Sequence, residues 1–211
     1  MKDHDWVILG AGEFGKEIYN IFFKNSKKKL VFFVDDYVKK KKFLKKKIIQ
    51  FDKLFQSKKT YNFVLAILDK NVRKKKISQI SKYKNLIPKN LIHDNTYLYN
   101  NFKFGKGNIL YPNSNINYGS NLGNFNILQF NSSVGHNSKI EDNCFIGSNS
   151  TISSNCLLKK NIFLGANSNI SRNIKIGSGA HIAPSTLIYK NIKRNMKVLS
   201  LPRLIFSKIK I

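Results

Sequence analysis

His136 is the residue of this sequence whose side chain and setting best suit proton transfer. Imidazole changes its charge near neutral pH, so it can accept a proton from an amine or a hydroxyl under ordinary conditions. The residue follows Val134 and Gly135 at a bend of the repeat described below, which places it outside the core. Such a side chain is suited to serve as a general base, a role typically worth about 10²–10⁴ in rate. A surface histidine without function is the alternative.

The remaining histidines and the cysteines are expected to have structural roles or none. His93 is expected to pack two parts of the chain together, and His181 is assigned no role. The chain has two cysteines, Cys144 and Cys156, which excludes a disulfide framework and a zinc cluster. Their positions in the repeat predict small, buried, apolar fillers. Because these residues offer no ligand set, no metal site is predicted.

A glycine-rich segment at residues 10–15 (GAGEFG) could hold phosphate groups. It follows an apolar run at 6–9 and precedes a helical apolar pattern, and the acidic pair 35–36 lies about 20 residues beyond it. Glycines let the backbone approach a diphosphate, and the helix start offers free N–H groups. The unit is only half of a dinucleotide-binding fold, so a mononucleotide or a nucleotide-sugar fits better than NAD. A turn that only packs helix against strand is the alternative.

The second half of the chain carries a repeat of six residues. Every sixth residue from Phe104 to Ile188 is apolar, without exception. The residue after it is often glycine, and the one two positions before it is mostly small. This period fits neither an α-helix nor a simple strand, but it is typical of a β-helix. We therefore predict a left-handed parallel β-helix of about five coils, with apolar side chains on the axis and Gly or Asn at the bends.

These patterns divide the chain into four parts. We expect an α/β half-Rossmann nucleotide-sugar-binding domain at 1–90, a connector at 91–100, the hexapeptide β-helix at 101–192 and a C-terminal tail at 193–211. In the first hundred residues, the expected strands lie at 6–9, 30–34, 63–68 and 91–92, with helices after the glycine-rich segment and through residue 81. The lysine-rich block 37–47 is expected to be a mobile surface loop.

The charge of the chain is strongly positive but has no purpose-built pattern. There are 38 basic and 11 acidic residues, a net charge of +27, and nearly all the basic residues are lysines. Readers of nucleic-acid sequence rely on arginine for bidentate contacts, so this composition argues against nucleic-acid binding. It favours a general attraction for anionic ligands such as phosphorylated substrates. Without an apolar run of about 18 residues or a secretory signal, a cytoplasmic protein without a membrane span is expected.

The succession of a half-Rossmann domain and a hexapeptide β-helix resembles the sialic acid O-acetyltransferase-like family of sugar acyltransferases. Within that family, the chain is most similar to acetyltransferases that N-acetylate UDP-linked 4-amino sugars in bacillosamine-type glycan pathways. The resemblance covers nearly the whole chain. The segments that carry it are 8–17, 33–36, 66–73, 91–93, 134–140 and 163–166, and 201–203 (LPR) looks like a degraded form of the family's ending.

The resemblance implies a mechanism and a set of site residues. His136 would take a proton from the acceptor, which then attacks the thioester of acetyl-CoA directly. A homotrimer would hold the pantetheine between neighbouring β-helices, and the nucleotide-sugar would bind to the N-terminal domain. The implied catalytic residues are His136 and Asn137, the substrate-binding residues are Gly10, Gly12, Phe14, Asp35, Asp36, Ala66, Ile67 and Arg73, and the acetyl-CoA-binding residues are Phe145, Gly165, Ala166 and Ala183.

Three positions depart from the family pattern. Asn137 stands where the family has an acid, Phe145 where it has a histidine that contacts the acyl-CoA, and Phe14 where it often has another histidine. These differences are compatible with a divergent acceptor, a slower enzyme or a protein that binds without catalysis. The open alternatives are therefore an O-acetyltransferase acting on a sialic-acid-like sugar, a non-catalytic nucleotide-sugar-binding trimer and, from the charge alone, a nucleic-acid-binding trimer.

Overall fold

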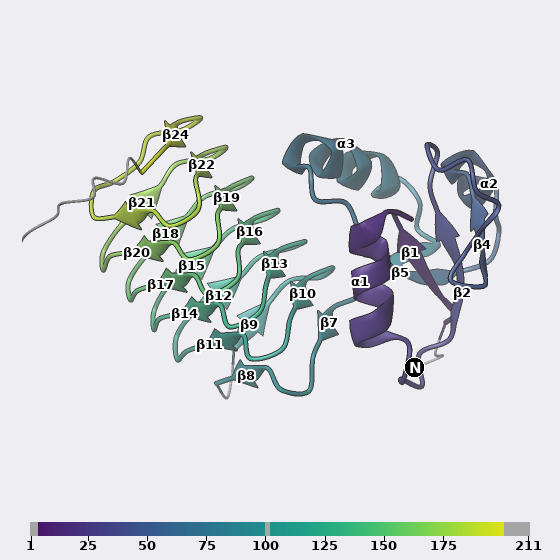
Figure 1. Ribbon diagram of the computed structural model, residues 1–211, viewed down its shortest axis with the longest axis horizontal. Helices are drawn as coiled ribbons and strands as arrows, with labels where there is room; N and C mark the ends of the chain where they lie inside the picture. The colour runs from purple at the N-terminus through teal and green to yellow at the C-terminus, as the bar shows by residue number, and fades with distance from the viewer. Residues whose placement is uncertain (1–3, 100–101, 201–211) are drawn as a thin grey trace, which may run out of the picture.

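The computed structural model describes residues 4–99 and 102–200. An α/β domain packs against one face of a β-helix (Figure 1). The N-terminal sheet has the strand order β3-β4-β2-β1-β5-β6. Its elements are β1 (Trp6–Leu9), α1 (Glu13–Phe22), β2 (Leu30–Val34), β3 (Lys42–Phe43), β4 (Lys46–Ile49), α2 (Phe51–Phe55), β5 (Tyr61–Leu65), α3 (Lys70–Ile80) and β6 (Leu86–Pro88). All pairs are parallel except β3–β4.

The central strand β1 is apolar throughout because both of its faces are covered. Ile8 joins a core cluster with α1 and the β-helix, whereas Val7 and Leu9 join a cluster with α2 and α3 on the opposite face. The observed β1, α1 and β2 agree with the predicted elements, and β5 ends at residue 65 rather than 68.

The prediction of a mobile loop over 37–47 is wrong in its second half. Residues 42–49 form the antiparallel hairpin of β3 and β4. Leu44 and Lys45 both have positive φ at its two-residue turn, which is the geometry of a type I′ turn. Phe43 and Ile48 pack against the core, so the lysines between them are the exposed side of a hairpin.

The β-helix has three flat faces, as predicted, and the strands of each face stack in parallel. The first face consists of β7 (Leu91–Ile92), β10 (Ile109–Leu110), β13 (Ile127–Leu128), β16 (Phe145–Ile146), β19 (Phe163–Leu164), β22 (His181–Ile182) and β24 (Lys197–Val198). The second consists of β8 (Tyr97–Leu98), β11 (Asn115–Ile116), β14 (Ser133–Val134), β17 (Thr151–Ile152), β20 (Asn169–Ile170) and β23 (Leu187–Ile188). The third consists of β9 (Lys103–Phe104), β12 (Asn121–Leu122), β15 (Lys139–Ile140), β18 (Leu157–Leu158) and β21 (Lys175–Ile176).

The interior of the left-handed β-helix is filled as the hexad pattern predicts from Leu110 onward, whereas Phe104, the first residue of that pattern, is exposed. The apolar column from Leu110 to Ile188 is buried as one cluster, and the small residues beside it are buried too. Cys144 and Cys156 are buried within this column, which agrees with the prediction of small inward fillers.

The bends use asparagine and glycine differently. Asparagine takes the left-handed conformation at most corners, with φ between 55° and 63°, because its short polar side chain tolerates that region. Gly165, which follows an apolar position, has no positive φ. A Cβ there would overlap the backbone of Pro184 in the next coil, so glycine is required for close approach rather than for a bend.

The β-helix is longer than the predicted range of 101–192. β7 pairs with β10 and β24 pairs with β22, so regular coils run from residue 91 to 198, about six in all. Ile92 and Leu98 extend the six-residue column by two positions, and this signal lies in the segment assigned to the connector. The last coil is two residues shorter than the others, because Ile182 pairs with Val198. The tail motif at 201–203 lies outside the described residues.

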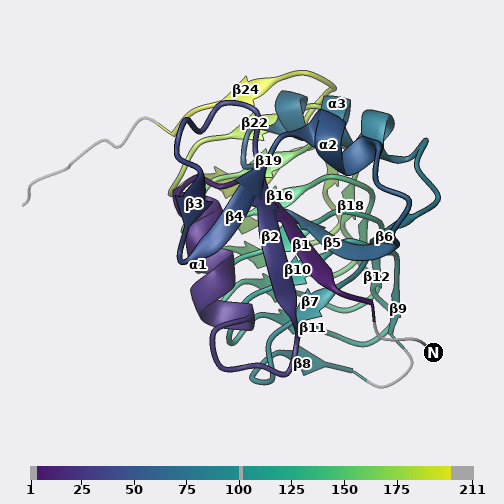
Figure 2. The same ribbon diagram turned by 90° about the vertical axis from the view of Figure 1, so that its right-hand side faces the viewer.

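The N-terminal domain covers the early strands of the first face (Figure 2). Leu91, Ile109 and Ile127 point outward from that face and are nevertheless fully buried against α1. His93 contacts Phe22 of α1 edge-on, with ring centroids 6.1 Å apart, which agrees with its expected packing role. Among the helices of residues 4–99 and 102–200, none has the length and apolar character needed to cross a bilayer.

Candidate active site

The glycine-rich segment meets two other loops at the carboxyl edge of the N-terminal sheet. Gly10 has a φ of +118°, and a Cβ there would overlap the carbonyl of Ala66 at the end of β5. The Ala11 N–H donates to Asp35 Oδ2 at the end of β2, over 2.8 Å. The predicted substrate residues Gly10, Asp35 and Ala66 are therefore brought together, at the edge where open α/β sheets bind ligands.

The start of α1 is open to solvent. Gly12 is the N-cap, and none of the described side chains caps the helix there. Gly12 is exposed, and a Cβ on it would meet no described atom within 4 Å. The acid of the first turn, Glu13, pairs with Lys16 over 3.7 Å. Free N–H groups and the positive end of the helix dipole make this a surface that can accept a diphosphate.

The acidic pair holds loops together in this structure. Asp35 Oδ1 accepts the backbone N–H groups of Tyr37 and Val38, at 2.8 and 3.2 Å. Asp36 accepts the N–H of Phe51 with one oxygen and pairs with Lys76 at 3.1 Å with the other. Both carboxylates therefore shape the rim of the loop cluster, and a direct contact with substrate stays a prediction.

Phe14 and Ile67 flank the same loop cluster. Phe14 is buried and belongs to a core cluster with Ala11, Ala66 and Tyr111 of the β-helix. Ile67 follows Ala66 and is half-buried. Phe14 thus faces the boundary between the two domains, where phenylalanine adds packing but no hydrogen bond.

Arg73 lies beneath this cluster and is buried. Its guanidinium donates to the carbonyls of Leu65 and Ile67, to the carbonyl of Phe125 and to Asn143 Oδ1. These bonds use four of the five guanidinium N–H groups. Arg73, a predicted substrate-binding residue, therefore donates its hydrogen bonds to protein acceptors on both sides of the domain boundary.

Three stacked rings form an aromatic wall on the later coils of the first face. Phe145, Phe163 and His181 point outward at successive coils and stack in parallel, with centroids 4.9 and 4.6 Å apart. Phe145 packs against the cluster that holds Ala11 and Ala66. The predicted acetyl-CoA residue Phe145 and the predicted substrate residues Phe14 and Ala66 therefore border the same core cluster at the domain boundary.

Cationic groups flank the far end of the aromatic wall. Burial and the nearby ammonium groups of Lys70 and Lys197 lower the pKa of His181, so its ring is held in the neutral form over a wider pH range. Lys70 reaches from α3 to the carbonyl of Gly179 over 2.7 Å. Phe163, His181 and Lys70 are absent from the predicted site, although the spacing of one coil from Phe145 could have revealed the first two.

The other predicted acetyl-CoA residues line the corner between the first and second faces. Gly165 and Ala166 follow β19, and Ala183 follows β22. Their backbone groups take part in bonds between coils: the N–H groups of Gly165 and Ala183 donate to the carbonyls of Ile182 and Val198, at 2.9 Å each. All four predicted acetyl-CoA residues thus belong to the first face or its edge.

His136 lies elsewhere, at the corner between β14 and β15, which joins the second and third faces. It is exposed, and Asn137 Nδ2 lies 3.3 Å from its Nδ1. Asn137 has a φ of 55° and donates its N–H to the carbonyl of Tyr118 one coil below, over 2.9 Å. In a three-sided prism this corner is opposite the first face. The structure therefore brings Asn137 to His136 but does not bring His136 to the loop cluster of its own chain.

No group of three or more His, Cys, Asp or Glu side chains that could hold a metal ion occurs in the described parts of the chain.

Comparison with known proteins supports the architecture. Residues 5–80 match the family model of the PglD N-terminal domain, and residues 119–154 match the bacterial transferase hexapeptide model of six repeats. No curated protein sequence matches the chain significantly.

Solved structures share the fold over nearly the whole chain. A histidine-to-asparagine variant of perosamine N-acetyltransferase from Caulobacter crescentus, in complex with CoA and GDP-perosamine, has a TM-score of 0.84 at 17% identity and covers 97% of both chains. The acetyltransferase domain of PglB from Neisseria gonorrhoeae, in complex with acetyl coenzyme A, has a TM-score of 0.84 at 17% identity over 92% of this chain and 95% of that one. WeeI from Acinetobacter baumannii has a TM-score of 0.72 at 19% identity over 93% and 96%.

The two family matches fall on the two domains that the structure shows. The first covers the loop cluster and α3, and the second covers the coils that carry His136 and Phe145. They confirm the resemblance drawn from the sequence. Residues 5–80 thus resemble the PglD N-terminal domain, and residues 119–154 resemble the hexapeptide repeats of bacterial transferases.

Proposed function

We propose that the protein is an acetyl-CoA-dependent acetyltransferase that acylates the amine of a nucleotide-linked amino sugar, with a UDP-sugar as the expected substrate in bacterial surface-glycan synthesis. One observation carries the proposal: Phe145 of the transferase coils packs against the core cluster at the domain boundary, and that cluster also contains Ala11 and Ala66 of the nucleotide-sugar loops. A nucleotide-sugar and an acyl-CoA can therefore lie side by side. The related fold from Caulobacter crescentus binds CoA and GDP-perosamine, which supports this pair of substrates.

The reaction needs one base. His136 takes a proton from the acceptor amine as the amine nitrogen attacks the thioester carbonyl of acetyl-CoA. The C–S bond of the tetrahedral intermediate then breaks, and the imidazolium returns its proton to the departing thiolate. The products are the N-acetylated sugar and CoA. A hydroxyl acceptor could use the same base, which keeps an O-acetyltransferase as the alternative.

The active site requires a second copy of the chain. His136 stands at the corner opposite the first face, so the width of the β-helix separates it from Phe145 and Gly12 of its own chain. We propose a homotrimer in which this corner of one copy faces the loop cluster and aromatic wall of its neighbour. Cyclic symmetry then repeats the same site at every boundary between copies.

The test is thiol release from acetyl-CoA with a panel of UDP- and GDP-linked amino sugars and their hydroxyl analogues. We expect turnover with a nucleotide-linked amino sugar, and a fall of about 10²–10⁴ in kcat for His136→Ala. His4→Ala is the matched control, because His4 precedes β1 and takes no part in the proposed site.

Two results would contradict the proposal. Equal rates in the wild type and His136→Ala would remove His136 as the base. No thiol release with any sugar, while UDP or GDP still binds, would favour the non-catalytic nucleotide-sugar-binding trimer.

A further inference from the structure

We propose that Arg73 is a positioning residue that sets the nucleotide-sugar loop at a fixed distance from the acyl-CoA wall. This inference rests on the proposed function for the identity of the two ligands. Its structural basis is independent of that assignment, because the bonds of Arg73 join the two domains directly.

On the side of the N-terminal domain, Arg73 holds the end of β5. Its Nη1 donates to the carbonyls of Leu65 at 3.2 Å and Ile67 at 3.0 Å. These two carbonyls flank Ala66, whose own carbonyl abuts Gly10 of the glycine-rich segment. A shift of the guanidinium would therefore move residues 65–67, against which the glycine-rich segment packs.

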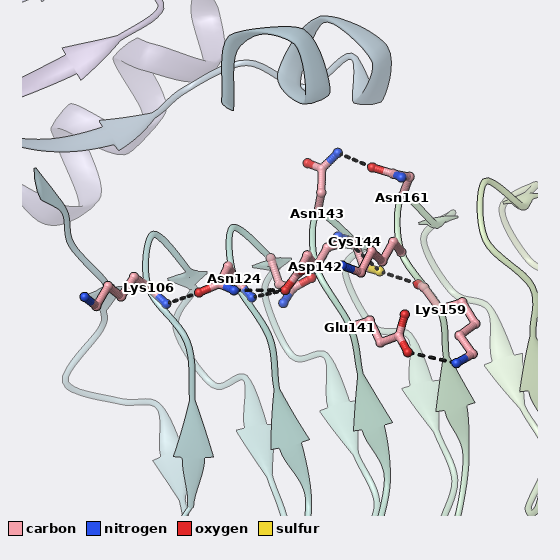
Figure 3. Close-up of polar contacts among 10 residues, drawn as sticks. Lys106, Asn124, Glu141, Asp142, Asn143, Cys144, Lys159 and Asn161 are labelled. Atoms are coloured by element: carbon pink, nitrogen blue, oxygen red, sulfur yellow. Dashed lines mark hydrogen bonds and ion pairs between the residues drawn. The ribbon is translucent and has the colours of Figure 1, made fainter. Parts of the chain in front are cut away.

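On the side of the β-helix, Arg73 holds the corner between the third and first faces. Its Nε donates to Asn143 Oδ1 at 2.9 Å, and its Nη2 donates to the carbonyl of Phe125 one coil below. Asn143 is held in turn by Asn161 Oδ1 at 2.8 Å, as Figure 3 shows, and by the carbonyl of Lys70 at 3.3 Å. Asn143 stands two residues before Phe145, the first ring of the aromatic wall.

The nature of the side chain matters because Arg73 carries a charge without a counter-ion. No carboxylate in the described residues forms an ion pair with it, and burial lowers the pKa of the guanidinium to about 10. Four neutral oxygens replace the water that would otherwise solvate the charge. Only a planar fork with several donors reaches acceptors in both domains at once, so lysine cannot reproduce the link.

The experiment compares Arg73→Lys and Asn143→Gly with a matched control, Asn173→Gly. Asn143 and Asn173 both have positive φ, at 57° and 63°, so glycine preserves the backbone at either corner. Asn173 lies at the corner between the second and third faces, away from the N-terminal domain.

Hydrogen exchange of the full-length protein is the first readout. We expect amides of residues 65–68 to exchange at least about tenfold faster in Arg73→Lys and Asn143→Gly than in the wild type, and unchanged in Asn173→Gly. The coils beyond Phe145 should keep their protection in all variants. Unchanged exchange at 65–68 in both test variants would overturn the proposal.

Kinetics separate positioning from mere stability. In Arg73→Lys, KM for the nucleotide-sugar should rise about tenfold or more, with KM for acetyl-CoA within about twofold of the wild type. A lower melting temperature with both KM values unchanged would mean a structural role only and would overturn the proposal. If the wild type transfers no acetyl group but exchange at 65–68 responds as expected, the proposed function fails and the positioning role stands.

Discussion

At the scale of single residues, the tautomer of His136 depends on the orientation of the Asn137 amide. An amide nitrogen can only donate, so the observed contact of Nδ2 with Nδ1 places the imidazole proton on Nε2. A base acting through Nε2 needs the opposite arrangement, in which Nδ1–H donates to Asn137 Oδ1. Rotation of the amide by half a turn provides it, because oxygen and nitrogen are nearly the same size. The residue can therefore support either tautomer.

Asn137→Asp should make the enzyme faster. A carboxylate can only accept from Nδ1–H, so it fixes the productive tautomer and stabilises the imidazolium formed during the reaction. Aspartate also tolerates the left-handed conformation observed here. We expect kcat to rise at least about threefold with saturating substrates. Asn173→Asp, at a similar corner, is the control. An unchanged or lower kcat in Asn137→Asp alone would show that the amide is not limiting.

At the scale of the coil, the buried small residues form a ladder of hydrogen bonds that includes both cysteines. Ser138 Oγ and Ser150 Oγ donate to carbonyls fifteen residues further along the chain, each at 2.9 Å. Cys144 Sγ and Cys156 Sγ contact carbonyls at the same separation, at 3.1 and 3.2 Å. The thiols therefore occupy serine positions, and nothing in their setting favours a thiolate.

The native thiols should be unreactive. Burial raises the pKa of Cys144 to about 12 and also raises that of Cys156. At pH 8 the thiolate fraction of Cys144 is then of order 10⁻⁴, and its burial blocks the reagent as well. We expect no labelling by a thiol reagent in the native protein over minutes, and labelling of both cysteines after unfolding in guanidinium. Fast labelling of the native protein would mean that these coils open readily.

The same scale shows what a sequence can predict in this protein. Each position of the six-residue repeat favours its own residue type, apolar on the axis and small beside it. The apolar column therefore predicts the β-helix without knowledge of how the N-terminal domain docks. The hairpin of β3 and β4 is harder to predict because its turn uses Leu44 and Lys45, without the usual Asn or Gly. The role of Arg73 depends on how two domains dock, and no spacing within either domain encodes that contact.

At the scale of the whole molecule, the proposed trimer takes its two binding surfaces and its base from different copies of the chain. In one chain, Phe145 packs against the core cluster at the domain boundary, whereas His136 lies at the corner of the β-helix opposite the first face. A complete site then takes its binding surfaces from one copy and its base from the next. If each site is shared between two copies, two impaired variants can regain activity when they assemble together. A site within one chain would not allow this.

Mixed assemblies of Gly12→Asp and His136→Ala should regain activity. Gly12 has room for a side chain, and an aspartate suits the N-cap, so this variant should fold while its carboxylate repels an anionic diphosphate. Each variant alone should be slower than the wild type by a factor of about 10² or more. After the two are unfolded and refolded together in equal amounts, about one quarter of the boundaries combine an intact Gly12 with a neighbour's intact His136. We expect thiol release near one quarter of the wild-type rate, and no such recovery when the variants are refolded separately and then mixed. Inactivity of the co-refolded sample, with both variants present in one trimer, would place His136 and its substrates in a single chain.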